Sequence, residues 1–125
     1  MGKILLNLSG HPAPRGAEEA FEKVFSVEVP NVDLSRKRAL AEAAQSLVSQ
    51  ALEDAEAKEA LLHGEAAVIL PGASALAGAV LAVLVGVTGT FPVLHWAVRT
   101  EGGFALSEGL DLSELRLAGR ALREG

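Results

Sequence analysis

The residues best suited to chemistry in this chain stand where its first apolar segment ends. The segment KILLNLSGH leads from apolar residues into Asn7, Ser9, Gly10 and His11, and Arg15 follows shortly after. Ligands of open α/β sheets bind outside the carboxyl ends of the strands, so this segment predicts a binding site. Gly10 would let the backbone approach a ligand. Ser9 and His11 would donate hydrogen bonds, and Arg15 would neutralise a phosphate. The alternative is an ordinary loop whose histidine faces water.

A second group of candidate residues follows another apolar run, AAVIL. Here the sequence LPGAS, with Gly72 and Ser74, leads from a buried strand into a helix. The free amide groups and positive dipole end of a helix form an anion site. Ser74 is alternatively the N-cap of that helix, and the two roles are compatible. If the first and third strands are adjacent, both loops open on the same edge of the sheet.

The third group is His95, Trp96 and Arg99, near the end of an apolar strand pattern. We expect Trp96 in the core and His95 to be a packing histidine. Arg99 either pairs with Glu101 or reaches an anion, and the sequence does not separate these roles. The basic run at residues 36–38 is interpreted as a solvated face.

Catalytic signatures are missing from the sequence. The chain has no cysteine and three histidines, so a thiol nucleophile, a disulfide and a cysteine-based zinc site are excluded. We expect no metal and no cofactor, because His and carboxylate residues show no ligand spacing and no dinucleotide or Walker pattern occurs. His11 and His63 could act as general acid or base, but nothing in the sequence places them together. The chain is better equipped to hold a ligand than to transform it.

Length and charge restrict the class of protein. The 125 residues are 50% hydrophobic, which suits one domain spanning residues 1–125. A net charge of −5 argues against binding to duplex DNA through a basic surface. The apolar run at the start is too short for a signal peptide, so we expect a cytoplasmic protein.

Apolar periodicity predicts a mostly parallel sheet between helices, followed by an antiparallel C-terminal hairpin. This order favours an α/β, Rossmann-like three-layer sandwich with right-handed crossovers. We expect Leu115, Ala118 and Leu122 of the last helix to pack on the sheet. The expected strands lie at residues 4–8, 27–29, 66–70, 91–99 and 104–106, and the expected helices at 17–25, 36–63, 74–87 and from 112 onward.

The helix expected after Ser74 is apolar on every side. No charged residue occurs between positions 66 and 98, but Pro71 and Gly72 divide this stretch too early for a membrane span. A small domain covers only one side of such a helix with its own sheet. We therefore expect the other side to contact a second copy of the chain, through Ala75, Gly78, Ala79, Ala82 and Gly86.

Three stretches together resemble a known family. The sequences ILLNLSGHPAP, LPGASALAGAVLAVLVGVTGTFP and HWAVRTEGGFALSEGLDLSEL are similar to small accessory proteins of type III CRISPR systems, of the Csx family in its fifteenth-numbered type. The resemblance spans most of the chain. It implies a Rossmann-like fold related to CARF sensory domains and a cyclic oligoadenylate ligand, cyclic tetraadenylate in particular. Ser9, Gly10, His11, Gly72 and Ser74 would surround its phosphates.

The resemblance implies a role in antiviral defence, in which such proteins lower the concentration of this RNA messenger. We expect binding and sequestration by a homodimer or larger homo-oligomer. One alternative is a metal-independent ring nuclease, in which a 2′-hydroxyl attacks its own phosphate and His11 acts as base. A second is a structural dimerisation module without a small ligand. The shortage of Lys and Arg at the two loops leaves backbone amides to carry much of the recognition.

Overall fold

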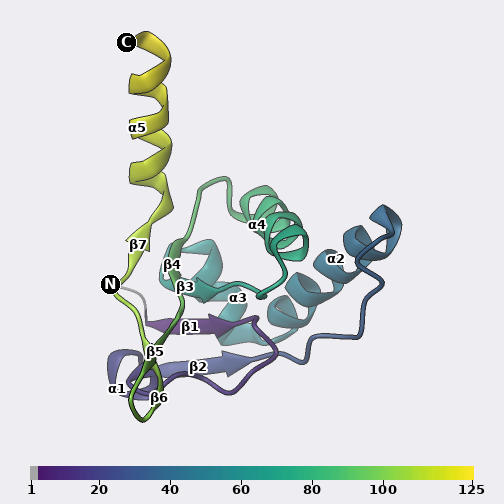
Figure 1. The fold of residues 1–125 in the computed structure, drawn as a ribbon, viewed down its shortest axis with the longest axis vertical. Helices are drawn as coiled ribbons and strands as arrows, with labels where there is room; N and C mark the ends of the chain where they lie inside the picture. The colour runs from purple at the N-terminus through teal and green to yellow at the C-terminus, as the bar shows by residue number, and fades with distance from the viewer. Residues whose placement is uncertain (1–2) are drawn as a thin grey trace.

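A computed structural model describes residues 3–125 of the chain (Figure 1). Helices and strands alternate through the first three quarters, and three short strands and a helix complete the fold. The elements in chain order are β1 (Ile4–Asn7), α1 (Ala17–Ala20), β2 (Lys23–Ser26), α2 (Lys37–Glu53), α3 (Ala55–Leu62), β3 (Ala66–Ile69), α4 (Ser74–Thr88), β4 (Val93–His95), β5 (Ala97–Thr100), β6 (Gly103–Leu106), β7 (Leu110–Asp111) and α5 (Leu112–Glu124).

The main sheet has five strands in the order β2-β1-β3-β4-β7. The first four are parallel, and β7 is antiparallel to β4. In the register of β1, Leu5 lies opposite Val24 of β2 on one side and Ala67 of β3 on the other. The mostly parallel sheet, with β3 in its centre, confirms the predicted Rossmann-like α/β class.

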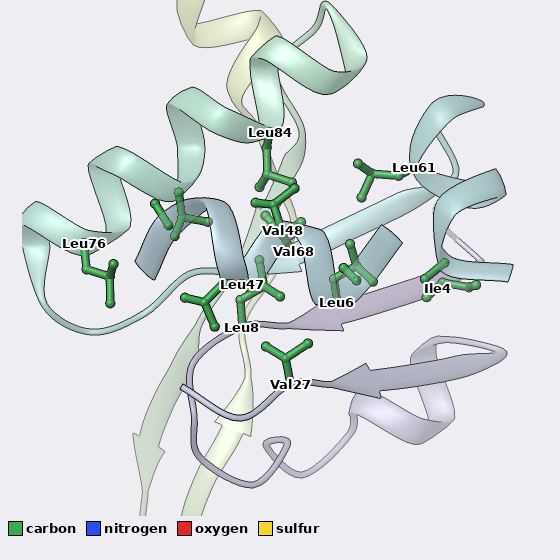
Figure 2. Packing of buried hydrophobic residues seen from close by; sticks show 14 of the residues in the cluster. Ile4, Leu6, Leu8, Val27, Leu47, Val48, Leu61, Val68, Leu76 and Leu84 are labelled. Carbon is green, nitrogen blue, oxygen red and sulfur yellow. The ribbon is translucent and has the colours of Figure 1, made fainter. Parts of the chain in front are cut away.

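The larger core lies between the sheet and helices α2, α3 and α4. Figure 2 shows Leu6 and Val68 from the sheet meeting Leu47 of α2 and Leu84 of α4. Ala43, Leu47 and Ala51 recur at helical spacing, so the buried face of α2 is the one that its apolar pattern predicts.

The helix predicted over residues 36–63 of the second crossover is in fact two helices. The chain turns at Asp54, whose carboxylate accepts a hydrogen bond from the Ala57 amide at 2.9 Å and caps α3. The Ser35 hydroxyl donates a hydrogen bond to the Asp33 carboxylate, and α2 begins at Lys37.

The opposite face of the sheet has a much thinner cover. The predicted helix over 17–25 ends at Ala20, and Val24 and Phe25 belong to β2 instead of that helix. A short apolar run fits both the helical and the strand periodicity, so its pattern alone does not decide between them. Pairing with β1 satisfies the backbone hydrogen bonds of this segment as a strand. The strand expected at residues 27–29 was therefore misplaced, because β2 ends at Ser26. The second face of the sheet is covered by α1 and Phe21.

The apolar pattern at 91–99 was predicted as one strand but forms two. β4 joins the main sheet, whereas β5 pairs with β6 in a separate antiparallel hairpin, with Val98 opposite Ala105. Between them, the Trp96 amide donates a hydrogen bond to the Ser107 hydroxyl oxygen at 2.8 Å. Trp96 is 43% exposed, so its expected core position was wrong. The C-terminal antiparallel hairpin itself is confirmed.

Helix α5 begins where its cap predicts, since the Asp111 carboxylate accepts a hydrogen bond from the Ser113 amide at 2.9 Å. The expectation that it packs on the sheet was wrong. It extends away from the sheet (Figure 1), and Leu115 and Leu122 are 51% and 82% exposed. Helices α2 to α4 cover one face of the sheet, and α5 leaves the sheet from the edge strand β7. Within residues 3–125 no helix combines the length and apolarity that crossing a membrane requires.

Candidate ligand-binding site

The two loops identified from the sequence open on the same edge of the sheet. β1 and β3 are adjacent and parallel, with Asn7 opposite Ile69 at their carboxyl ends. The loop after β1 and the loop between β3 and α4 therefore start side by side. This is the edge at which open α/β sheets bind ligands.

The buried side chain of Asn7 holds the first loop in place through hydrogen bonds. Its side chain is 1% exposed, and its amide nitrogen donates to the His11 carbonyl at 2.8 Å and to the Ser26 hydroxyl at 3.2 Å. Its amide oxygen accepts from the Ser9 hydroxyl at 2.6 Å and from the Ser9 amide at 3.3 Å. The Ser9 hydroxyl oxygen also accepts from the His11 amide. Asn7 and Ser9 thus set the shape of the loop, and Asn7 does not face solvent.

Gly10 is required by the geometry of the same loop. Its φ is +82°, and a Cβ atom built on it would lie 2.9 Å from Cγ2 of Val29. A side chain at this position would meet both left-handed backbone strain and a steric overlap. The glycine lets the loop close over the residues that follow β2.

His11 lies at the mouth of an apolar cavity that the sequence did not predict. The cavity measures about 450 Å³ and lies between the first loop and the β5–β6 hairpin. Two backbone hydrogen bonds hold these walls together: Arg15 N to Phe104 O at 3.0 Å, and Leu106 N to Arg15 O at 2.8 Å. The lining residues are His11, Pro12, Ala13, Pro14, Ala97 and Phe104.

Sequence reasoning missed five of the lining residues: Pro12, Ala13 and Pro14 of the first loop, and Ala97 and Phe104 of the hairpin. Phe104 was assigned to a strand, and its 55% exposure was not foreseen. The sequence shows two prolines in the first loop and an aromatic residue in the predicted hairpin. Only the backbone pairing of Arg15 with the hairpin brings them together.

The two arginines assigned to the site both lie on or against the hairpin. The Arg15 guanidinium donates to the Thr100 hydroxyl at 3.2 Å. That of Arg99 lies over the Phe104 ring, 6.0 Å from its centre. In the described chain Arg99 forms no ion pair with Glu101. Both arginines are exposed, so an anion can reach them from the solvent.

The β3–α4 loop presents an uncapped helix end. Ala73, not Ser74, is the N-cap of α4, so the capping role expected for Ser74 was wrong. No side chain caps the helix, and no acidic residue lies in its first turn. Ser74 is exposed, and the Cβ position of Gly72 faces open space. The amide groups at this helix end are available to an acceptor from outside.

His95 is a packing histidine, as expected. Its Nδ1 lies 3.1 Å from the Ser107 carbonyl, and its ring stands edge-on to Phe21 at 5.3 Å. The basic residues 36–38 are exposed, and Arg38 pairs with Glu42 at 3.0 Å along α2. This agrees with a solvated face.

The titratable groups that depart from ordinary behaviour lie mostly at the opposite edge of the sheet. The amide of Ala57 lowers the pKa of Asp54, with a further contribution from Lys23. The Glu56 carboxylate raises the pKa of Lys23. These groups form an ion-pair cluster between β2 and α3. Across residues 3–125 no three His, Asp or Glu side chains gather in a way that could hold a metal ion.

Comparison with protein-family models, with curated protein sequences and with solved structures finds no match to this chain.

Proposed function

We propose that this protein binds a cyclic oligoadenylate, cyclic tetraadenylate in particular, and damps type III CRISPR signalling by sequestering it. The observation that carries the proposal is the apolar cavity between the first loop and the hairpin, beside the carboxyl edge of the sheet. Its volume lies within the usual range for small-ligand sites. A nucleobase is recognised by stacking on aromatic and planar apolar side chains, and Phe104 with the two prolines supplies such walls.

The phosphates have a separate place to bind. The uncapped end of α4 offers amide donors and a positive dipole end, with exposed Ser74 beside it and space at Gly72. Such an end favours phosphate without needing many basic side chains. This accounts for ligand binding by a protein whose net charge is −5.

Sequestration is favoured over cleavage by the isolation of His11. Attack by a ribose 2′-hydroxyl needs a positioned base and stabilisation of the leaving oxygen. In the described chain no carboxylate pairs with His11, and the nearest site residues serve to shape the loop. The proposal keeps the cytoplasmic location expected from the sequence. It also includes a homo-oligomer, because a two-fold dimer would present its loops twice to a ring of four repeating units.

Incubation with radiolabelled cyclic tetraadenylate tests the proposal directly. With protein in excess, we expect the intact ring to migrate with the protein on a native gel. With substoichiometric protein, we expect the unbound ring to persist. Linear products that exceed the protein in amount would replace sequestration by the ring-nuclease alternative.

Thermal unfolding tests the rival structural module. A ligand at 100 times its dissociation constant adds about 2.7 kcal/mol, which corresponds to a rise in Tm of roughly 10 °C for a domain of this size. Absence of any shift with cyclic oligoadenylates would favour a module without a small ligand.

A matched pair of variants locates the site. Phe104→Ala removes the exposed ring of the cavity and should weaken ligand binding by roughly 5- to 150-fold, which corresponds to about 1–3 kcal/mol per stacked base. Leu62→Ala removes a side chain of similar exposure, 50%, from the opposite edge of the sheet. It should leave the affinity unchanged. Equal affinities of the two variants would place the ligand elsewhere.

A further inference from the structure

Helix α5 is an amphipathic helix whose apolar side has no cover. It points away from the rest of the molecule (Figure 1), and none of its residues is buried. Leu112, Leu115, Ala118 and Leu122 fall on one face of the helix at three- and four-residue spacing. Such a face in a water-soluble domain normally packs against another surface.

The exposed surface of the whole chain indicates the size of the missing partner. The accessible area is 7831 Å². A compact monomer of 12.9 kDa exposes about 6,300 Å². The excess of about 1,500 Å² exceeds the roughly 800 Å² that each partner buries in a standard interface and falls in the range of obligate homodimers. The chain therefore exposes as much extra surface as a stable pairing of two copies would remove.

The distribution of charge favours a second copy as the partner. Residues 3–111 hold eight Lys or Arg and fourteen Asp or Glu, a net charge of −6. Residues 112–125 hold three Arg and two Glu, a net charge of +1. The arginines Arg116, Arg120 and Arg123 lie along one side of the apolar stripe. The arm of one copy is thus attracted to the body of another.

Charge also argues against pairing the two arms with each other in an antiparallel dimer. A two-fold axis between antiparallel helices brings the same side of each helix together. The three arginines of both arms would then gather on one side and repel. A surface without like charge suits the arm better.

Helix α4 provides that surface. It has no charged residue, and Ala75, Gly78, Ala82 and Gly86 are exposed along one side of it. The helices match in length, since 15 and 13 residues correspond to about 20 Å each. Small residues on one helix leave a groove that leucines of another can enter.

We propose that α5 is an exchanged arm: in a two-fold dimer, the apolar stripe of each α5 packs on the exposed side of α4 in the other copy. The exchange is reciprocal, so both arms and both α4 surfaces are covered at once. The assembly goes beyond the proposed ligand binding and does not depend on it, and its tests use protein without ligand.

The first test is the mass of the full-length protein in solution, measured by light scattering after size-exclusion chromatography. The wild type should show twice the chain mass of 12.9 kDa. The double variant Leu115→Glu/Leu122→Glu should be a folded monomer, because both side chains are exposed in the protomer. Leu117→Glu is the matched control: Leu117 is 59% exposed on the opposite side of α5, and this variant should remain a dimer. A monomeric wild type, or equal masses for the double variant and the control, would overturn the proposal.

The second test identifies the contact itself and exploits the absence of cysteine from the chain. Tagged Leu122→Cys protein is mixed with untagged Ala82→Cys protein, allowed to exchange and then oxidised. We expect disulfides between the two variants, and far fewer when Leu117→Cys replaces Leu122→Cys. Dominant disulfides within the Leu122→Cys population would instead indicate arm-to-arm pairing and reject the α4 contact.

A membrane surface is the other chemistry that a basic amphipathic helix can meet. Co-sedimentation with vesicles of phosphatidylcholine and phosphatidylserine distinguishes it. The dimer with covered leucines should stay in the supernatant. Binding of the wild type to these vesicles, lost in Leu115→Glu/Leu122→Glu, would overturn the exchanged arm. Failure of ligand binding in the separate gel assay would leave these results unaffected.

Discussion

Two regions of the molecule use their apolar residues differently. Every buried residue of the described chain lies at or before Leu84, whereas the β5–β6 hairpin and α5 contain none. Both regions contain several leucines, and the hairpin adds Val98 and Phe104. In the first region these side chains meet each other between the sheet and α2 to α4. In the second, Leu106 packs against the smaller core cluster, and most of the others line a cavity or face solvent.

The difference separates the residues that maintain the fold from those available to partners. An apolar side chain inside a packed cluster contributes to folding through its removal from water. The same side chain on a projecting hairpin or arm contributes nothing until a ligand or another protein covers it. We therefore expect substitutions in the two regions to change different measurements.

The largest expected effect comes from truncating a core leucine. Leu6 is fully buried, and Leu6→Ala should lower the free energy of unfolding by about 2–5 kcal/mol. Leu117→Ala, on the exposed side of α5, should stay within about 0.5 kcal/mol. Urea unfolding followed by circular dichroism measures both. A cost above 1 kcal/mol for Leu117→Ala would mean that α5 packs on its own domain.

A pair of glycines gives the next contrast, within the site. Gly10→Ala should cost about 2–4 kcal/mol, from left-handed strain and the overlap with Val29. Gly72→Ala should leave stability unchanged, because its φ is ordinary and its Cβ position is open. Adding Val29→Ala to Gly10→Ala should restore part of the loss by removing the overlap. Equal stability of the two single variants in thermal unfolding would contradict this geometry.

A smaller effect is expected from pH at the cap of α3. The pKa of Asp54 is lowered in the folded state, chiefly by the Ala57 amide. Its carboxylate therefore stabilises the fold above the unfolded pKa of about 3.9, and this contribution is lost as pH falls through the lower folded value. Asp54→Asn retains a capping side chain but cannot titrate. The Tm difference between wild type and variant should shrink between pH 5 and pH 2, measured by calorimetry, and a constant difference would exclude this role.

The smallest effect concerns Trp96, the single tryptophan of the chain. Because it sits at the base of the hairpin and is 43% exposed, acrylamide should quench its fluorescence readily in the folded protein. Its signal should change little across the unfolding transition that circular dichroism reports. Strong shielding of Trp96 in a monomeric sample would show that the hairpin belongs to the packed region.

Local pattern predicted much of the first region. The apolar runs before Ser9 and Leu70 became β1 and β3, and the periodicity around Leu47 predicted the buried face of α2. The carboxyl edge of these strands was identified as the site for the same reason, since strand direction fixes where loops open. Where two periodicities compete over a few residues, as at Val24, pairing with β1 decided the outcome.

The sequence by itself determined the α/β class, the two loops that follow β1 and β3 and the amphipathic character of α5, because these follow from turn residues and apolar spacing along the chain. Tertiary structure alone decided that Phe104 and His11 line one cavity and that Trp96 is exposed. It also decided that α5 leaves the sheet. A repeating pattern shows which face of an element avoids water, but the surface that covers this face is fixed by residues distant in sequence.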